Sequence, residues 1–250
     1  MTKDNLDIFI CTHKDFDVTV KDQQYKIICG EDTEIKNPNG LMVVREINTP
    51  EVTNVQPSLG EVSRIYWVWK NWDVKEYVGF CHYRRIILDS KEVILDFLKN
   101  DKFVYPPYSS IIPISEEEPG TIVGQYSFNH NGDDLLDCVN IMSKMFSINI
   151  NVLLDIIQSP MLTYGNIFVT RKEDFNQYCH FLFSILAAFR GMHDIHNMND
   201  IKRHIDENID KYIKKEKNQE TVDYNYQSRF LGFLSERIFN IYLYLLKRQG

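Results

Sequence analysis

The sequence predicts an α/β sandwich with a mainly parallel central sheet. Short apolar runs that suit buried strands recur along the chain, as in Leu6–Cys11 and Tyr77–Cys81. Between such runs lie stretches whose apolar residues are three and four apart, as on one face of a helix. Strands that alternate with helices in this way are typical of a parallel sheet covered by helices.

The composition is that of a globular protein. The chain has 250 residues, of which 44% are hydrophobic and 25% charged, which suits a sizeable core in one or two domains. The net charge of −7 argues against general nucleic-acid binding, which needs a basic face, but a few local arginines suffice for one nucleotide. Aromatic residues make up 13%, so rings beyond those that the core uses can stack on nucleobases or sugars.

Cysteine usage and hydropathy indicate a cytoplasmic protein. The five cysteines are odd in number and show no C-x-x-C spacing, so neither a zinc site nor a disulfide framework follows. No apolar run approaches the roughly 20 residues that a membrane-spanning helix needs, and the apolar core near the N-terminus is too short for a signal peptide. We expect contact with a membrane to be at most peripheral, at the inner face.

A polar run follows the first expected strand, Leu6–Cys11. It consists of Thr12, His13 and Lys14. Ligands of an open α/β sheet bind outside the carboxyl ends of its strands, so this run is a candidate ligand contact. The alternative interpretation is a plain surface loop.

Further strands and connections are expected on either side of the central segment. Tyr25–Cys29 suits a second strand, and residues 31–57 suggest an extended loop with a minor strand at 41–44. Lys91–Lys99 suits a short amphipathic helix, and Lys102–Tyr105 suits a strand. The acidic, proline-containing residues that follow, 108–122, are expected to form a solvated loop.

The most informative stretch begins at Ser58. Ser58 and Glu61 have the spacing of a capping box, in which each side chain satisfies a backbone amide at a helix start. An apolar stripe that we expect to be buried against the sheet follows, formed by Leu59, Val62, Tyr66 and Trp69. Tyr77–Cys81 then suits a central strand.

Four polar residues follow that central strand directly. They are His82, Tyr83, Arg84 and Arg85. Two adjacent arginines suit an anion such as a phosphate, because guanidinium groups bind oxyanions in bidentate fashion. The alternative is a solvated strand end whose arginines form structural ion pairs.

The runs YWVWKN and YVGFCHYRR resemble the bacterial capsular-polysaccharide-synthesis family catalogued as domain of unknown function 4422, taken to be glycosyltransferases. The resemblance covers most of the chain, including T-H-K after the first strand and R-x-x-G-F-x-x-E-R from Arg229. Two segments depart from the family. Tyr25–Ile28 lacks the proline that the family has in this strand, and Glu51–Gln56 is shorter than the D-N-I-S segment of the family. We therefore infer no donor contact for Glu51–Gln56 from the family.

The resemblance implies a GT-A-like three-layer sandwich in which residues 1–250 form a single domain. It implies transfer of a sugar from a nucleotide-sugar, with a UDP-sugar as the expected donor. The implied acceptor is a capsular or lipopolysaccharide glycan, or a lipid-linked oligosaccharide. Donor contacts are then assigned to the two polar runs: Thr12, His13, Lys14, His82, Tyr83, Arg84 and Arg85.

Such an enzyme must stabilise the departing nucleoside diphosphate, usually through a divalent ion such as Mn²⁺ or Mg²⁺ on a D-x-D pair. No D-x-D follows Tyr77–Cys81. Either Arg84 and Arg85 neutralise the diphosphate directly, or His82 and a distant carboxylate hold a divalent ion. We favour the arginines and assign no metal ligand. The missing D-x-D also leaves an alternative function, a non-catalytic nucleotide- or glycan-binding subunit of a polysaccharide assembly complex.

Candidate catalytic residues lie at the start of a helix expected from about residue 134 to 146. His130, Asp133 and Asp134 match a series of the family that runs Q-Y, H and then D-L. Asn131 or Asp133 also suits the N-cap of this helix. The remaining aspartate is then expected to act as a base or to bind sugar hydroxyls.

A strand within Met161–Val169 resembles the N-M-F-I strand of the family and supplies the expected sugar and acceptor contacts, Tyr164, Gly165 and Asn166. Glycine permits close backbone approach, and asparagine offers a donor and an acceptor to a sugar. A second capping box, Thr170 with Glu173, is expected to open a core helix. Its buried face is predicted to contain Phe175, Tyr178, Leu182, Ile185 and Phe189.

The last third of the chain contains several histidines but no complete metal motif. His193 and His196 lack a third spaced ligand, so H-D-I-H is interpreted as surface. Residues 191–222 are interpreted as a lid or variable linker that is helical in part. The final helix has an apolar face formed by Leu234, Ile238, Ile241 and Leu245. Near its start, Arg229, Glu236 and Arg237 are expected to form an ion-pair network that supports the site.

Overall fold

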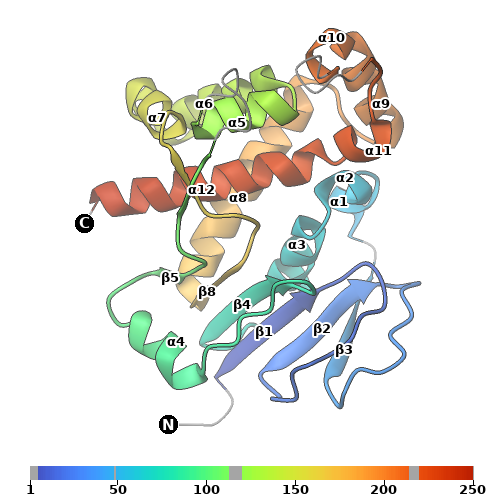
Figure 1. The fold of residues 1–250 in the computed structure, drawn as a ribbon, viewed down its shortest axis with the longest axis vertical. Coiled ribbons are helices and arrows are strands. Elements are labelled where there is room, and N and C mark those ends of the chain that lie inside the picture. The colour runs from blue at the N-terminus through green and yellow to red at the C-terminus, as the bar shows by residue number, and fades with distance from the viewer. Residues whose placement is uncertain (1–4, 48, 113–119, 214–219, 250) are drawn as a thin grey trace. The chain divides into compact units, whose positions relative to one another are not determined.

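A six-stranded sheet lies at the centre of one of the two compact units into which the chain divides (Figure 1). The computed structural model describes residues 5–47, 49–112, 120–213 and 220–249. We call the two parts the sheet unit (residues 1–53, 61–106 and 165–180) and the helical unit (residues 54–60, 107–164 and 181–250). Each is described by itself below.

The sheet has the order β3-β2-β1-β4-β8-β5. Its strands are β1 (Leu6–Cys11), β2 (Tyr25–Gly30), β3 (Met42–Glu46), β4 (Tyr77–His82), β5 (Phe103–Val104) and β8 (Phe168–Arg171). The first four run parallel, whereas β8 is antiparallel to both β4 and β5. The predicted α/β fold with a mainly parallel sheet is therefore confirmed. The minor strand expected at 41–44 is a full edge strand, because β3 pairs with β2 along its whole length.

Both faces of the sheet are covered, which makes three layers. One face of β1 packs with α4 (Lys91–Phe97), in a cluster that includes Ile8, Ile10 and Ile94. On the other face lie α3 (Val62–Asn71), the Trp72 that follows it and the first half of α8 (Lys172–Met192). There, Phe9 contacts Trp72 and Phe80, and Phe80 stacks on Phe175 of α8.

The helical unit is built around α12 (Phe230–Gln249) and the second half of α8. The other helices are α2 (Gln56–Leu59), α5 (Ile122–Asn129), α6 (Gly132–Phe146), α7 (Ile150–Ile157), α9 (Met198–Glu207), α10 (Ile209–Tyr212) and α11 (Tyr224–Gln227). A short ribbon pairs β6 (Ser109–Ser110) with β7 (Met161–Leu162). The predicted cores of both long helices are confirmed, except that Leu245 is only half-buried.

Both predicted capping boxes are wrong, for the same reason. Ser58 lies inside the short helix α2, with Gly60 at a φ of 59° ending it, while Glu61 precedes α3 without a side-chain cap. The backbone of Ser58 and Leu59 packs against Gly232 of α12, which fixes α2 as a separate element. Thr170 belongs to β8, and its hydroxyl donates to the carbonyl of Lys102 instead of capping α8.

Other expectations from the sequence are corrected in part. Leu59, Val62 and Tyr66 are buried as predicted, but Trp69 is half-buried, with its ring against Tyr66 and His180. The expected lid or linker contains α9 and α10, in line with the expectation that it is helical in part, whereas α5 and α7 were not predicted. The acidic run at 115–118 lies outside the described residues.

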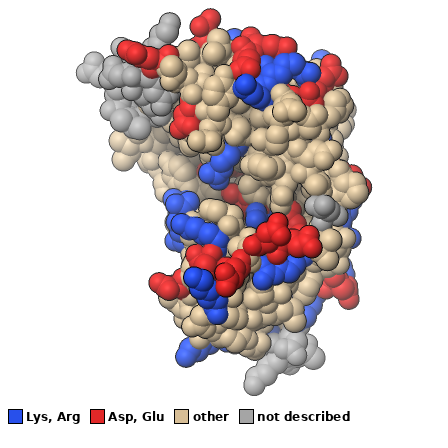
Figure 2. Space-filling view, turned by 90° about the vertical axis from the view of Figure 1, so that its right-hand side faces the viewer, with Lys and Arg blue, Asp and Glu red and all other residues tan. Residues whose placement is uncertain are grey.

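The five cysteines are buried and free, as the sequence predicts. Burial raises the pKa of the Cys81 thiol to about 12, so this thiol is protonated at neutral pH. Within the described ranges no helix is both long and apolar enough to cross a membrane. On the face drawn in Figure 2, acidic and basic side chains are interspersed, so this face does not offer the continuous basic area that nucleic-acid binding needs.

Gly79 lies in the centre of β4, and replacing it with alanine should lower the free energy of unfolding by about 1–3 kcal/mol. An added Cβ would come within 2.8 Å of Val169 Cγ2 and 3.2 Å of the Phe168 carbonyl oxygen. Because one neighbour is backbone, the sheet itself must shift. Gly191 in α8 is the control, since its Cβ would meet nothing within 4 Å. Gly191→Ala should stabilise the chain by up to about 1 kcal/mol, and equal effects in urea unfolding would contradict the packing argument.

Candidate functional site

The residues after β4 form a tight turn at the carboxyl edge of the sheet. The Arg85 amide donates to the His82 carbonyl over 2.7 Å, which closes the turn, and the Arg84 amide donates to His82 Nδ1 over 3.2 Å. The Tyr83 amide donates to the Cys11 carbonyl over 3.1 Å, so the turn is attached to the end of β1. Backbone hydrogen bonds therefore fix where Tyr83 and the arginines leave the strand.

The polar run after β1 is anchored by a buried threonine. The Thr12 hydroxyl donates to the Lys14 carbonyl over 2.6 Å and accepts from the Lys14 amide over 3.2 Å. Thr12 thus holds the chain in a bend that leaves His13 and Lys14 exposed. Because Cys11 is in register with His82 in a parallel pair, the two polar runs emerge at the same level of the sheet.

The ring of Tyr83 lies between the two runs. It contacts the ring of His13 edge-on at 5.5 Å between centroids. Lys14 Nζ lies 5.6 Å and Arg84 Cζ 5.4 Å from the centroid of the same ring. The structure therefore brings together the seven residues predicted as donor contacts. We call Lys14, Arg84 and Arg85 the cation cluster.

No carboxylate neutralises the cation cluster within the described part of the chain, because none of its three members takes part in an ion pair there. Other cations of the sheet unit are paired: Lys26 contacts Asp7 over 2.6 Å, and Arg64 contacts Glu46 over 3.9 Å. The alternative interpretation of the arginines as structural ion pairs therefore has no support in these contacts. Three exposed, unneutralised cations at one strand edge suit an anion with several negative charges.

The buried ion network around Asp7, in the same unit, differs from the cation cluster. Asp7 is buried near the start of β1 and accepts hydrogen bonds from Lys26 and Trp72. Burial raises the pKa of this carboxyl, but its hydrogen bonds, led by the one from Lys26, outweigh burial and hold the pKa below the usual value. Asp7 is shared by Lys26 and Lys75, over 2.6 and 3.0 Å, so these cations have a carboxylate partner, which the cation cluster lacks within the described residues.

The residues at the strand edge do not make a metal site by themselves. Across residues 5–47, 49–112, 120–213 and 220–249, no group of three His, Cys, Asp or Glu side chains is arranged to hold a metal ion. His82 Nδ1 accepts a backbone hydrogen bond from Arg84, so the neutral ring carries its proton on Nε2 and would have to give up this hydrogen bond to bind a metal ion through Nε2. A divalent ion here would need most of its ligands from a bound diphosphate and water.

One of the predicted sugar-binding residues, Gly165, has a backbone conformation that favours glycine. Gly165 has a φ of +77°, a value that a residue with a Cβ rarely adopts, so glycine is needed for the bend that leads into β8. Asn166 is buried, and its Nδ2 donates to Glu61 Oε1 over 3.4 Å. Tyr164 is partly exposed. Contact of these residues with a sugar stays a prediction.

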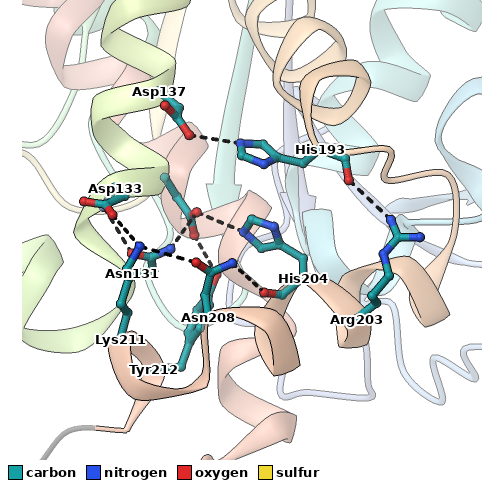
Figure 3. Close-up of polar contacts among 10 residues, drawn as sticks. Asn131, Asp133, Asp137, His193, Arg203, His204, Asn208, Lys211 and Tyr212 are labelled. Atoms are coloured by element: carbon teal, nitrogen blue, oxygen red, sulfur yellow. Dashed lines mark hydrogen bonds and ion pairs between the residues drawn. The ribbon is translucent and has the colours of Figure 1, made fainter.

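Asn131, His204 and Tyr212 take part in a buried hydrogen-bond network in the helical unit (Figure 3), and their shared partner is the carboxylate of Asp134. Its Oδ1 contacts Asn131 Nδ2 and His204 Nε2, both over 2.9 Å, and its Oδ2 accepts from the Tyr212 hydroxyl over 2.6 Å. The side chain is 1% exposed. Asp134 thus attaches α9 and α10 to the start of α6, and these contacts occupy both of its oxygens.

The other two predicted catalytic residues have different surroundings. Asp133 is 60% exposed and pairs with Lys211 over 2.6 Å, and its amide is capped by Asn131, which is the N-cap of α6. His130 is buried, with its ring stacked on Phe233 and its Nδ1 2.9 Å from Gln227 Oε1. The catalytic role of all three stays a prediction, and the contacts of Asp134 favour a structural one.

The expected supporting network forms in part. Arg237 pairs with Glu236 over 3.2 Å, donates to Gln125 Oε1 and lies over the ring of Tyr126. Arg229 instead lies over the ring of Phe233, 5.7 Å from its centroid. The network therefore ties α12 to α5 within the helical unit.

The sequence contains a signal for the burial of His204 that our interpretation missed. His196 is exposed and His193 half-buried, in line with a surface H-D-I-H, whereas His204 is 4% exposed. His204 lies on the buried face of α9 beside Ile201 and Ile205, at the three-and-four spacing of an apolar stripe. A polar residue on that stripe indicates a buried partner, here Asp134.

Comparisons with known proteins identify the family and a shared fold. The model of the family described as Domain of unknown function (DUF4422) matches residues 7–209. No curated protein sequence matches the chain. The chain is similar in structure to the apo form of a bifunctional glycosyltransferase, WbbM, with a TM-score of 0.71 and 20% sequence identity. The match covers 99% of this chain and 43% of that one, and at this identity it shows a shared fold.

Proposed function

The chain belongs to the family catalogued as domain of unknown function 4422, and from this premise we propose that it is a glycosyltransferase using a nucleoside-diphosphate sugar. The expected donor is a UDP-sugar, and the expected acceptor is a capsular or lipopolysaccharide glycan, free or lipid-linked. The observation that carries the proposal is the cation cluster, which lies unneutralised at the carboxyl edge of β1 and β4. The fold shared with a glycosyltransferase supports the reaction class.

The cation cluster suits the chemistry that a sugar transfer requires. Breaking the bond between the anomeric carbon and the β-phosphate leaves an additional negative charge on the departing diphosphate. Fixed cations at that position stabilise the transition state more than the ground state, because the charge grows as the bond breaks. Arg84 and Arg85 offer planar donor pairs that match phosphate oxygens, and Lys14 adds a point charge.

A second function from a different class is a non-catalytic nucleotide- or glycan-binding subunit of a polysaccharide assembly complex. The feature in its favour is that β4 ends in His82 where a metal-binding D-x-D would be expected. Such a subunit would bind the same nucleotides at the same cations. Turnover separates the two functions.

The test is a panel of nucleotide sugars measured by thermal unfolding and by release of free nucleotide. At a concentration 100 times its Kd, a diphosphate-linked donor should raise the Tm by about 5–10 °C, because it stabilises the folded state by about 2.7 kcal/mol. A CMP-linked sugar, which has one phosphate, should raise the Tm less. Release of nucleotide on addition of an acceptor would support transfer. Binding without any turnover would favour the second function in its nucleotide-binding form. No binding of any nucleotide sugar would contradict the glycosyltransferase and leave only a glycan-binding subunit.

A further inference from the structure

The aromatic ring of Tyr83 contacts two members of the cation cluster that come from different strands. Lys14 follows β1 and Arg84 follows β4, yet Nζ of the one and Cζ of the other both lie within 6 Å of the ring centroid. That is the range in which the negative face of an aromatic ring attracts a cation. One ring thus links the two polar runs through their charges.

The ring itself is held in place from several sides. The Tyr83 amide is bonded to the Cys11 carbonyl, which fixes the start of the side chain. The rings of His13, Phe16 and His82 lie 5.5, 5.7 and 4.3 Å from the Tyr83 ring between centroids. A side chain restricted in this way can impose an orientation on the flexible cations that it attracts.

An aromatic ring holds a cation without cancelling its charge, in contrast to a carboxylate. In the same unit, Lys26 is held by Asp7 and Arg64 by Glu46, and each of these cations is neutralised by its partner. Lys14 and Arg84 have no such ion pair within the described residues, so their charge stays available to a ligand. Lys and Arg side chains are otherwise costly to order, and restricting them before binding reduces that entropic cost.

We infer that Tyr83 is a positioning residue, whose ring holds Lys14 and Arg84 ready for the diphosphate through cation–π contacts. The inference rests on the proposed function, since it assumes that the cation cluster binds the diphosphate. In this role Tyr83 acts on the ligand only through Lys14 and Arg84. The role requires the face of the ring but not the hydroxyl group. The role is distinct from stacking on the nucleobase.

Binding of inorganic pyrophosphate, measured by calorimetry in EDTA, tests the inference without requiring the sugar or the acceptor. Tyr83→Phe keeps the ring face and should bind within about twofold of wild type, whereas Tyr83→Leu should bind about three- to tenfold more weakly. Phe97→Leu is the matched control, because it removes an exposed ring of the same unit that the contacts of Tyr83 do not include, and it should leave binding within about twofold.

Two further measurements separate cation–π contacts from a packing role. In a Lys14→Met, Arg84→Met background, Tyr83→Leu should have no further effect on the remaining affinity, because the cations that it positions are gone. Fluorinated phenylalanines at position 83 weaken the ring's negative face at nearly constant size, so affinity should fall with each added fluorine. This series remains informative even if Tyr83→Leu does not fold.

Several outcomes would overturn the inference. Equal losses in Tyr83→Phe and Tyr83→Leu would place the role on the hydroxyl, and an unchanged affinity across the fluorinated series would remove the cation–π contact as its cause. Either result, with pyrophosphate still bound by wild type, would leave the proposed function standing. If wild type does not bind pyrophosphate at all, both the inference and the diphosphate site of the proposed function are wrong.

Discussion

Asp134→Ala should lower the free energy of unfolding by about 3–5 kcal/mol, because it removes the shared acceptor of a buried network. Asn131, His204 and the Tyr212 hydroxyl all contact this carboxylate. Without it, three buried polar groups would lose the acceptor that they share. The loss should be visible in urea unfolding as a lower midpoint, and amides of α9 and α10 should exchange faster with solvent.

Asp133→Ala is the matched control, since it removes the neighbouring carboxylate from an exposed position. Its ion pair with Lys211 is about half exposed on both sides, and such surface pairs contribute less than about 1 kcal/mol. The comparison also bears on function. Equal and small stability losses would contradict the structural role of Asp134 and return it to the candidate catalytic residues.

Arg84→Ala and Arg85→Ala should each weaken binding of the nucleotide-sugar donor by roughly ten- to a hundredfold. A charge-assisted hydrogen bond to phosphate is worth about 1.5–3 kcal/mol, which corresponds to that range. Lysine at either position should recover only part of the loss, because an ammonium group cannot make the two-pronged contact. If the arginines act without a metal ion, wild-type affinity in calorimetry should persist in excess EDTA.

Arg171→Ala is the control for these two variants. Arg171 lies in the same sheet but opposite Tyr77, the first residue of β4, and so at the other end of this strand from the cation cluster. Its removal should leave donor affinity unchanged. Loss of binding in EDTA, with little effect of either Arg84→Ala or Arg85→Ala, would contradict the mechanism. It would indicate a metal ion bound by His82 and a carboxylate.

The sequence predicted the features that depend on neighbours close along the chain. An apolar run such as Tyr77–Cys81, or Leu6–Cys11 with Asp7 as its one polar residue, has few alternatives to a buried strand, and the two runs form adjacent parallel strands. Parallel strands end at one edge, so the polar residues that follow them meet there. That reasoning predicts that Thr12–Lys14 and His82–Arg85 lie at the same edge of the sheet, where the rings of His13 and Tyr83 are in contact.

Predictions from local sequence patterns were wrong where residues far along the chain pack against or hydrogen-bond to the same residue. Ser58 and Thr170 both have capping-box spacing, yet Ser58 is inside a helix packed on Gly232, and Thr170 donates to Lys102. The spacing of a capping box describes only three or four residues. Packing and hydrogen bonds to partners far along the chain offered these side chains a different environment.

The sequence by itself thus determined the sheet core and the place of the cation cluster, because strand character and strand ends are local properties. Only the tertiary structure decided which titratable residues are buried and which residues they contact. Asp134 meets His204 and Tyr212 across 70 and 78 residues, respectively, and no periodicity links such positions. Whether a carboxylate is buried and satisfied, or exposed like Asp133, depends on which distant donors the folded chain brings to it.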